Sequence, residues 1–360
     1  MGDIYPRFTI GAVQAASVMF DLDKTIDKAV RLIEEAADRG AAIIGFPELF
    51  IPGHTNVWYM GKKSNPLSVQ GELFKELVKN GVRVPGPETN RLCSAAKKAH
   101  ACVVIGINEL DTLFPGTLYI SQLFISDKGE ILGVHRKLVP TLDEKLVYSR
   151  GDGSHLNVYE TTHGKMSALN CGEHNHDLNK YALLAMGTQI HVASWPPFPK
   201  HIFGDTQRDA TDFRVRQFAR EGQLFIMNCC GMADEQNIDV CCDNQEEKDN
   251  LVANSGGGSS IIGPNGEHLA GPLYDEEGVV TAEVSLEDAL LGKQAHNVLG
   301  HYARWDVLSL NFNRERLGPF KETPEQGRNT AELLDTFREL KGEIQQIKNR
   351  LESVEKKLGS

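Results

Sequence analysis

The feature that most constrains the fold is a series of short apolar runs, bounded by turn residues, that recur along most of the chain. Several of them are too continuously apolar to be strands with one face in water, so they predict buried strands. The runs are FTIGAVQAA (8–16), AAIIGFP (41–47), CVVIGINEL (102–110), YISQLFISD (119–127), MSALNC (166–171), QIHVASW (189–195), LFIMNCC (224–230) and GSSIIG (258–263).

Helical patterns separate some of these runs. The segment 23–40, DKTIDKAVRLIEEAADRG, places its apolar residues on one face and ends at Gly40, a residue that suits a helix C-terminus. Strand, helix and strand in this order predict an α/β fold. Turn signals at 126–130 (SDKGE) and 263–267 (GPNGE) stand between strand-like runs, so we expect hairpins in a sheet that is not purely parallel.

Composition narrows the class of protein. The chain has 360 residues, of which 41% are hydrophobic, and can therefore bury a large core. Its 38 basic residues are outnumbered by 49 acidic ones, and the net charge of −11 disfavours a nucleic-acid or anionic-membrane partner. No apolar run approaches a membrane span, and no signal peptide is expected. Seven cysteines, an odd number, fit free thiols in a reducing compartment, so we expect a cytoplasmic protein.

The C-terminal segment carries a different pattern. Its apolar residues alternate at spacings of four and three, which is the heptad pattern of a coiled coil. We therefore expect a first domain over 1–315 and a tail over 316–360 that contains a heptad helix over 331–358. The heptad residues are Leu333, Phe337, Leu340, Ile344, Ile347, Leu351, Val354 and Leu358.

Charges beside these apolar residues favour self-association of the tail. In a parallel pair of helices, Glu343 of one helix faces Lys348 of the other, and Arg350 faces Glu355, so both pairs have opposite signs. The alternative is a single amphipathic helix that lies on its own domain. Gly342 weakens either helix by about 1 kcal/mol.

The stretch 167–187, SALNCGEHNHDLNKYALLAMG, holds four chemically active side chains close together: Cys171, Glu173, His174 and His176. A structural metal site would need a second ligand pair. The sequence offers only two pairs of adjacent cysteines, which seldom chelate one ion, so we expect no metal.

Cys171 ends a predicted strand, and the segment 177–187 begins a predicted helix. At such a junction a side chain is exposed at the sheet edge, and the helix N-terminus lowers the pKa of a thiol. A reactive thiolate is therefore one interpretation of Cys171, and a small core residue is the other.

Charged residues follow two other predicted strands. Glu48 comes directly after one, and Lys137 and Glu144 lie within 135–146, HRKLVPTLDEKL. Taken singly, Glu48 reads as a solvated loop carboxylate and Lys137 as part of a surface basic cluster. Together with Cys171 they supply an acid/base, a cation and a nucleophile.

The motifs FPELF, HRKLVPT and LNCGEHNH, in this order and at these distances, resemble the Glu-Lys-Cys signatures of the nitrilase superfamily of carbon–nitrogen hydrolases. The resemblance runs from about Phe8 to Phe312. It implies a four-layer αββα sandwich whose monomers pair helix faces into dimers, and the nitrilase-branch relatives commonly form spirals or filaments. The segments GHYARWDVL, EKLVYSRGDGS and YALLAMGTQIHVASWPP resemble the nitrilase branch more than the amidase or carbamoylase branches.

The resemblance implies a role for each charged residue. Cys171 matches the nucleophile, Glu48 the general base, Lys137 the cation beside the tetrahedral intermediate, and Glu144 the second acid of the lysine motif. The implied reaction converts an organic nitrile to a carboxylic acid and ammonia through a thioimidate and a thioester. It requires no cofactor.

The substrate pocket is expected beside these residues, with core or dimer packing as the alternative for the aromatic ones. Glu173 is expected to orient the intermediate. The residues expected to bind substrate are Glu173, His174, His54, Trp58, Tyr59 and Trp195.

One departure from the nitrilase pattern leaves the product open. Many nitrilases carry an aromatic residue directly after the cysteine, whereas this chain has Gly172. Lost bulk there widens the pocket or changes how the intermediate collapses, so an amide product is an alternative. An amidase or a cyanide-hydrating enzyme of the same superfamily is a second reading. A scaffold without activity, assembled by the tail, is a third.

Overall fold

The computed structural model describes residues 5–54, 66–197, 206–242, 244–245, 248, 256–319 and 328–358. It divides the chain into two compact units, Met1–Arg316 and Leu317–Ser360. The first unit contains all the strands of the described residues, and the second contains the long helix α11 (Arg328–Leu358).

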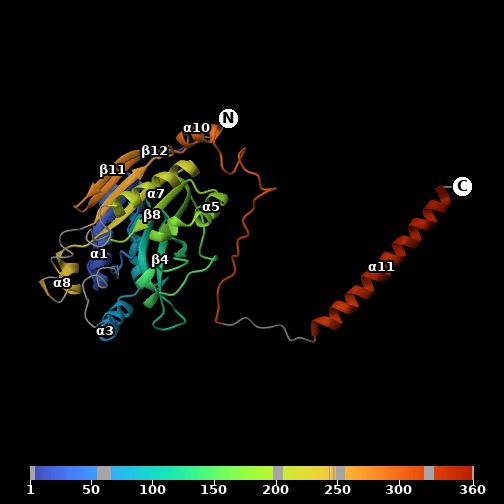
Figure 1. Ribbon diagram of the computed structural model, residues 1–360, viewed down its shortest axis with the longest axis horizontal. Helices are drawn as coiled ribbons and strands as arrows, with labels where there is room; N and C mark the ends of the chain where they lie inside the picture. Colours follow the sequence, from blue (N-terminus) through green and yellow to red (C-terminus); the bar gives the residue numbers. More distant parts are fainter. Residues whose placement is uncertain are drawn as a thin grey trace. The chain divides into compact units, whose positions relative to one another are not determined.

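Two sheets form the first unit (Figure 1). In the first sheet the strand order is β5-β4-β3-β2-β1-β12; β1 pairs in parallel with β2, and β2 with β3, whereas the other pairs are antiparallel. Its strands are β1 (Arg7–Ala16), β2 (Ala41–Gly45), β3 (Cys102–Leu110), β4 (Leu118–Ile125), β5 (Ile131–Arg136) and β12 (Gly278–Ser285).

The second sheet has the order β6-β7-β8-β9-β10-β11, with β7, β8 and β9 parallel. The two sheets are continuous at one corner, where Ala15 and Ala16 of β1 pair with Gly231 and Met232 of β9. The strands are β6 (Tyr159–Thr161), β7 (Gly164–Asn170), β8 (Ile190–Trp195), β9 (Phe225–Met232), β10 (Gly257–Ile262) and β11 (His268–Tyr274).

Helices cover the outer faces of both sheets. On the first sheet lie α1 (Leu22–Asp38) and α4 (Pro87–Ala99); on the second lie α5 (Asp177–Ala185) and α7 (Thr206–Gly222). The remaining described helices are α3 (Pro66–Lys79), α8 (Glu235–Cys241), α10 (Asp288–Ala295) and the 3-10 turns η1 (Leu142–Leu146) and η2 (Cys171–Asn175).

The core consists of three apolar layers. Between the sheets, Ile10 and Ile43 of the first sheet pack with Val192 and Phe225 of the second. Separate clusters hold α1 and α4 against the first sheet and α7 against the second. Each fully buried large apolar side chain contributes roughly 1.5–3 kcal/mol, so both faces of each sheet must be covered.

This architecture confirms the predicted four-layer αββα sandwich with a C-terminal helix. Every apolar run predicted as a buried strand contains one, and the turns SDKGE and GPNGE join the antiparallel pairs β4–β5 and β10–β11. Among the helices that the structure describes, none combines the length and apolarity needed to cross a bilayer.

Candidate active site

Glu48 is held by the loop that follows β2. This loop docks onto β3: Phe46 N donates to Val104 O (2.9 Å), and Ile51 N donates to Gly106 O (3.0 Å). The approach is so close that a Cβ on Gly106 would lie 2.5 Å from Leu49 N. The glycine therefore lets the backbone around Glu48 rest directly on the sheet.

Lys137 bridges two buried carboxylates. Its backbone N, directly after β5, donates to Ile120 O at 2.8 Å. Its ammonium donates to Glu48 Oε1 at 2.7 Å and to Glu144 Oε2 at 2.8 Å. Glu144 Oε2 also accepts from Thr141 N at 2.6 Å, which fixes the first turn of η1. All three charged side chains are buried, so the surface interpretation of Lys137 and the solvated-loop interpretation of Glu48 are wrong.

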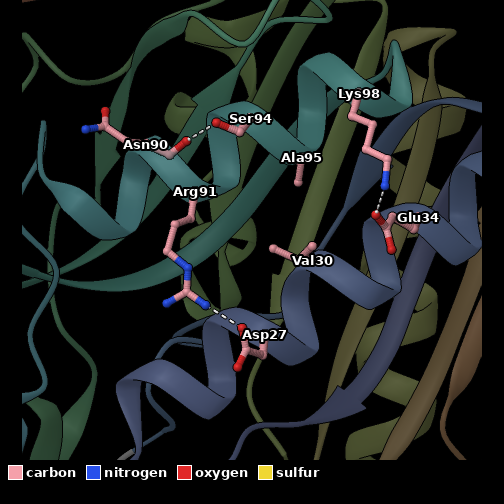
Figure 2. A pocket seen from close by; sticks show the side chains of 8 residues that line it. All are labelled: Asp27, Val30, Glu34, Asn90, Arg91, Ser94, Ala95 and Lys98. Atoms are coloured by element: carbon pink, nitrogen blue, oxygen red, sulfur yellow. Dashed lines mark hydrogen bonds and ion pairs between the residues drawn. The ribbon is translucent and has the colours of Figure 1, made fainter.

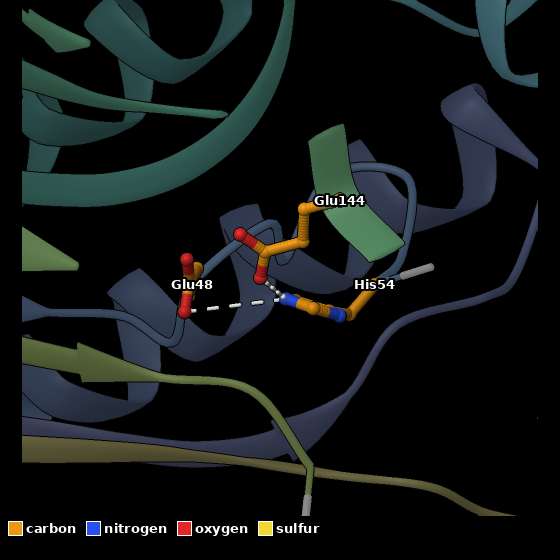
Figure 3. Close-up of side chains that lie close together, drawn as sticks. All are labelled: Glu48, His54 and Glu144. Carbon is orange, nitrogen blue, oxygen red and sulfur yellow. Dashed lines mark ion pairs between the residues drawn. The ribbon is translucent and has the colours of Figure 1, made fainter. Parts of the chain in front are cut away.

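His54 is the fourth buried side chain of this cluster. Its Nε2 lies 3.6 Å from Glu144 Oε1 and 4.0 Å from Glu48 Oε2, the carboxylate oxygens that the ammonium does not contact (Figure 3). Glu48, His54 and Glu144 offer ligand atoms within 4.8 Å of one another. Because the Lys137 ammonium already lies within hydrogen-bond distance of both carboxylates and offsets part of their charge, this donor set favours an ion pair over a bound metal cation.

Burial and charge set the protonation of the cluster. Burial, followed by repulsion from Glu144, raises the pKa of Glu48 to about 8 despite the attraction of Lys137. Burial disfavours the Lys137 ammonium, but Glu48 and Glu144 outweigh it and raise the pKa of Lys137. Burial and the Lys137 charge hold the pKa of His54 well below its ordinary value, so its imidazole is neutral.

Cys171 lies at the junction between β7 and η2, as the strand-to-helix pattern predicts. Its φ of 42° is in the left-handed region, which a non-glycine residue adopts only when its surroundings hold it there. The residue as a whole is half-buried. Burial and the charge of Glu48 raise its pKa, while Lys137 lowers it, so the resting sulfur is a thiol that needs a base.

A buried ion pair fixes the turn after Cys171. Glu173 accepts from His135 Nε2 (2.8 Å), Leu138 N and Asn170 N, so both its oxygens are occupied. The other nitrogen of His135 faces the His155 carbonyl at 3.2 Å. Because both partners of this ring only accept, His135 is an imidazolium. This geometry favours a positioning role for Glu173 over the substrate contact that the sequence suggested.

A second buried network reaches the Cys171 backbone. His174 Nδ1 lies 2.9 Å from the Cys171 carbonyl oxygen and must donate to it. In the neutral ring, Nε2 then accepts from His191 Nε2 at 3.0 Å, and His191 Nδ1 accepts from the Ser167 hydroxyl at 2.8 Å. Burial lowers the pKa of His174 to about 4 and that of His191 well below its ordinary value, so both rings are neutral.

The predicted aromatic pocket wall is only partly described. Trp195 is buried at the end of β8 and stacks on His174, with ring centroids 4.9 Å apart and planes 25° apart. It therefore supports the ring that holds the Cys171 carbonyl. Trp58 and Tyr59 lie outside the described residues.

Sequence reasoning missed His135, His191 and Ser167. His135 and Lys137 are two residues apart, and this period-two spacing places both on the buried side of the chain. That spacing was the available signal for His135. Nothing in the local sequence links His191 or Ser167 to Cys171, because adjacent parallel strands bring them together.

A separate groove of about 430 Å³ lies between α1 and α4 (Figure 2). Ion pairs of Arg91 with Asp27 and of Lys98 with Glu34 rim it, over a floor that contains Val30. Its lining has no nucleophile paired with a base, so it is not a candidate for the chemistry that the Cys171 cluster supports.

Comparison with known proteins identifies the family of the chain. The family described as "Carbon-nitrogen hydrolase" matches residues 9–293. An aliphatic nitrilase of Rhodococcus rhodochrous is 39% identical, over 94% of this chain and 93% of its own. A nitrilase of Bacillus sp. (strain OxB-1) is 37% identical, over 91% and 94% of the two chains.

Solved structures share the fold at low sequence identity. The C. elegans NitFhit protein has a TM-score of 0.67 and 16% identity, covering 87% of this chain and 69% of that one. A carbon–nitrogen hydrolase of Helicobacter pylori G27 has a TM-score of 0.61 and 20% identity, covering 80% and 92%. The family match over residues 9–293 and the two nitrilases at 37–39% identity show that the chain belongs to the carbon–nitrogen hydrolase family, in its nitrilase branch.

Proposed function

We propose that this chain is a nitrilase that hydrolyses an organic nitrile to the carboxylic acid and ammonia, with Cys171 as the nucleophile. The observation that carries the proposal is the buried Glu48–Lys137–Glu144 cluster beside a thiol in a left-handed backbone conformation. Full-length relatives that are nitrilases support the same reaction.

In the first half of the reaction, the Cys171 thiol adds across the C≡N bond. Glu48 takes the proton from sulfur, the sulfur attacks the nitrile carbon, and the nitrogen receives the proton. The product is a thioimidate. Lys137 stabilises the negative charge that develops on nitrogen, and the charge is largest in the transition state, where this stabilisation accelerates the step.

In the second half, water adds to the thioimidate with Glu48 as the base. The tetrahedral intermediate loses ammonia by breaking its C–N bond, which leaves a thioester on Cys171. A second water hydrolyses the thioester and regenerates the thiol. Two waters are consumed for each nitrile, and one carboxylic acid and one ammonia are released.

The acid is the proposed main product, and the amide is the competing one. If the tetrahedral intermediate breaks its C–S bond instead of its C–N bond, it releases an amide. The residue after the nucleophile bears on this choice: a Cβ at Gly172 would lie 3.3 Å from Thr141 Oγ1, so the glycine leaves space beside η1, the turn that carries Glu144. An amide-specific or cyanide-hydrating function has no support among the nitrilase relatives described above.

Trapping the covalent intermediate tests the mechanism. Acid-quenched protein from a reaction with a nitrile is digested and analysed by mass spectrometry. We expect the acyl mass on the peptide that contains Cys171, and none on the same peptide from Cys171→Ala. Acylation at another cysteine, such as Cys93, would overturn the assignment of the nucleophile.

We also propose a homodimer that assembles into a larger oligomer or spiral in the cytoplasm. Exposed apolar side chains on the outer helices of the second sheet, Leu178 of α5 and Phe213 of α7, support the dimer. The free thiols of Cys93, Cys102, Cys229 and Cys230 are consistent with a reducing compartment.

A further inference from the structure

The helix α11 presents an apolar stripe to solvent. It is 31 residues long and lies beyond residue 293, where the family match ends. Six large apolar side chains on it, spaced alternately three and four residues apart, are 49–67% exposed. They are Phe337, Leu340, Ile344, Ile347, Leu351 and Val354.

This stripe needs a partner. An isolated helix has little stability in water, and a narrow seam at heptad spacing is buried by a second helix that wraps around it. Gly342 occupies the f position of the heptad, on the face away from the seam, and a Cβ there would meet no atom within 4 Å. The glycine therefore does not interrupt the seam.

Charges beside the seam identify the partner as a second copy in parallel. With Ile344 at an a position, Glu343 of one helix faces Lys348 of the other in a parallel, in-register pair. In antiparallel pairs centred on this segment, Lys348 faces either Lys341 or the other Lys348. The antiparallel register that places Lys348 against Glu355 leaves Phe337 and Leu340 beyond the end of the partner's α11, so the parallel pair avoids the like-charge contact and keeps the whole stripe paired.

We propose that α11 forms a parallel, in-register coiled coil with α11 of a second copy of this chain. The proposal specifies one surface of the self-association proposed above, and it does not depend on the role of Cys171. The globular units of the two chains are thereby tethered at the same end of the coil.

Engineered cysteines in the full-length protein test the register. Val354→Cys occupies a d position, so in a parallel pair it faces its own copy at a distance that a disulfide can span. Ser353→Cys, on the adjacent outward c position, is the matched control. After mild oxidation we expect covalent dimers of the Val354→Cys protein at least fivefold above those of Ser353→Cys and the wild type.

Two other results would overturn the proposal. Equal cross-linking of the Val354→Cys and Ser353→Cys proteins would mean that the seam is not paired. Preferential dimers between mixed Ile344→Cys and Val354→Cys chains would mean that the pair is antiparallel. Nitrile hydrolysis is measured on the same proteins. If the proteins hydrolyse the nitrile at the wild-type rate but do not cross-link through α11, only this inference is refuted and the proposed function stands.

Charge substitutions give an independent test. Glu343→Lys alone and Lys348→Glu alone each create like-charge contacts in the parallel pair, so we expect each to weaken self-association roughly tenfold. Mixing the two variants should restore association as a heteromer. Stronger association of Lys348→Glu alone would contradict the parallel arrangement, because in the antiparallel register that places Lys348 against Lys341 the change turns a repulsion into an attraction.

Discussion

Single residues decide the electrostatics of the site. Two carboxylates, Glu48 and Glu144, share the ammonium of Lys137 with no other cation in contact among the described residues. One shared ammonium compensates the burial of two carboxylates only in part, and this raises the pKa of Glu48. A general base with a pKa near the working pH exchanges protons in both directions.

The first prediction is the pH dependence of hydrolysis. Glu48 acts as a base only when ionised, and its pKa is raised to about 8. We therefore expect kcat/KM to rise with pH through about 8 and to level off above it. The measurement is the kcat/KM profile from about pH 5.5 to 9.5. A profile that is flat from pH 6 to 9 would contradict the assignment, and Glu48→Gln should lower kcat roughly 10²–10⁴-fold.

The second prediction concerns His54. Its neutral ring places Nε2 3.6 Å from Glu144 Oε1 and 4.0 Å from Glu48 Oε2, too far for hydrogen bonds but close enough for the dipole of an Nε2–H to favour the ionised carboxylates. We expect His54→Phe to raise the pKa of Glu48 further and move the rising limb of kcat/KM to higher pH. His54→Gln keeps an N–H donor and is the control. If His54→Phe stays active and the rising limb of its kcat/KM profile stays at the wild-type pH, His54 does not lower the pKa of Glu48.

At this scale the sequence predicted the buried charged residues and Cys171 better than the side chains that support them. Glu48, Lys137 and Cys171 stand at strand ends in recognisable motifs: Glu48 and Lys137 follow β2 and β5 of the first sheet, and Cys171 follows β7 of the second. His191 could not be predicted, because its partner His174 is seventeen residues away and only the β7–β8 pairing brings them together. Folding creates this contact, and no local pattern encodes it.

At the scale of elements, the contact between β3 and the Glu48 loop positions the base. A Cβ at Gly106 would lie 2.5 Å from Leu49 N and even closer to the Pro47 carbonyl, and backbone cannot yield as a flexible side chain can. We expect Gly106→Ala to displace Glu48 and lower kcat at least tenfold, with a loss of about 1–3 kcal/mol in unfolding free energy.

The control for this substitution is Gly11→Ala in β1. Its nearest neighbours are side-chain atoms of Ala41, Val279 and Thr281, the closest being Ala41 Cβ at 3.2 Å, and none of them belongs to the Glu48 loop. We expect it to change stability with little effect on kcat. Equal kcat values for both variants would contradict a positioning role for the β3 contact. Urea unfolding and steady-state kinetics provide the two readouts.

The network that joins β7, β8 and η2 predicts acid sensitivity. The pKa of His174 is lowered to about 4, so between the ordinary value of about 6.5 and 4 the unfolded chain binds a proton that the folded chain does not. The contribution of His174 to the free energy of unfolding is therefore complete above about pH 6.5, and it falls by about 2 kcal/mol by pH 5. His135, whose pKa is raised, has the opposite effect: it stabilises the folded chain below about pH 6.5, and this stabilisation is lost as the pH rises above that value.

The measurement for the network is the unfolding free energy at pH 7 and pH 5. His174→Gln removes one titrating group, so its loss between the two pH values should be smaller than that of the wild type. An equal loss in both proteins would mean that His174 does not titrate as the burial of its ring requires.

Element prediction succeeded where burial is continuous. The runs of β3 and β9 are buried at every residue, and their sequences are apolar apart from Asn108 and Glu109 in β3 and Asn228 in β9. The strand β11 was expected only as the second arm of the hairpin at GPNGE and not as an apolar run, because it is mostly half-buried or exposed and contains Gly271 and Pro272. The strand β12 was also missed, since only its pairing with β1 makes it part of the sheet.

On the scale of the whole molecule, the two units make separable contributions. The first unit contains the Glu48–Lys137–Cys171 site, and the second contains α11. We expect truncation after Lys321 to reduce the size of the assembly and leave the dimer, with kcat within about twofold because no described site residue is lost. Light scattering and nitrile hydrolysis on the truncated protein measure both; an unchanged size would contradict a role of the tail in assembly.

The most direct test of the proposed function is ammonia release from aliphatic, aromatic and arylacetic nitriles, the matching amides and cyanide. Wild-type protein is compared with Cys171→Ala, and the acid-to-amide ratio is recorded. We expect release from at least one nitrile class, mainly with the acid as product, and a loss of at least roughly 10³-fold in Cys171→Ala. Release from amides alone, or release from nitriles that persists in the folded variant, would contradict nitrile hydrolysis by Cys171.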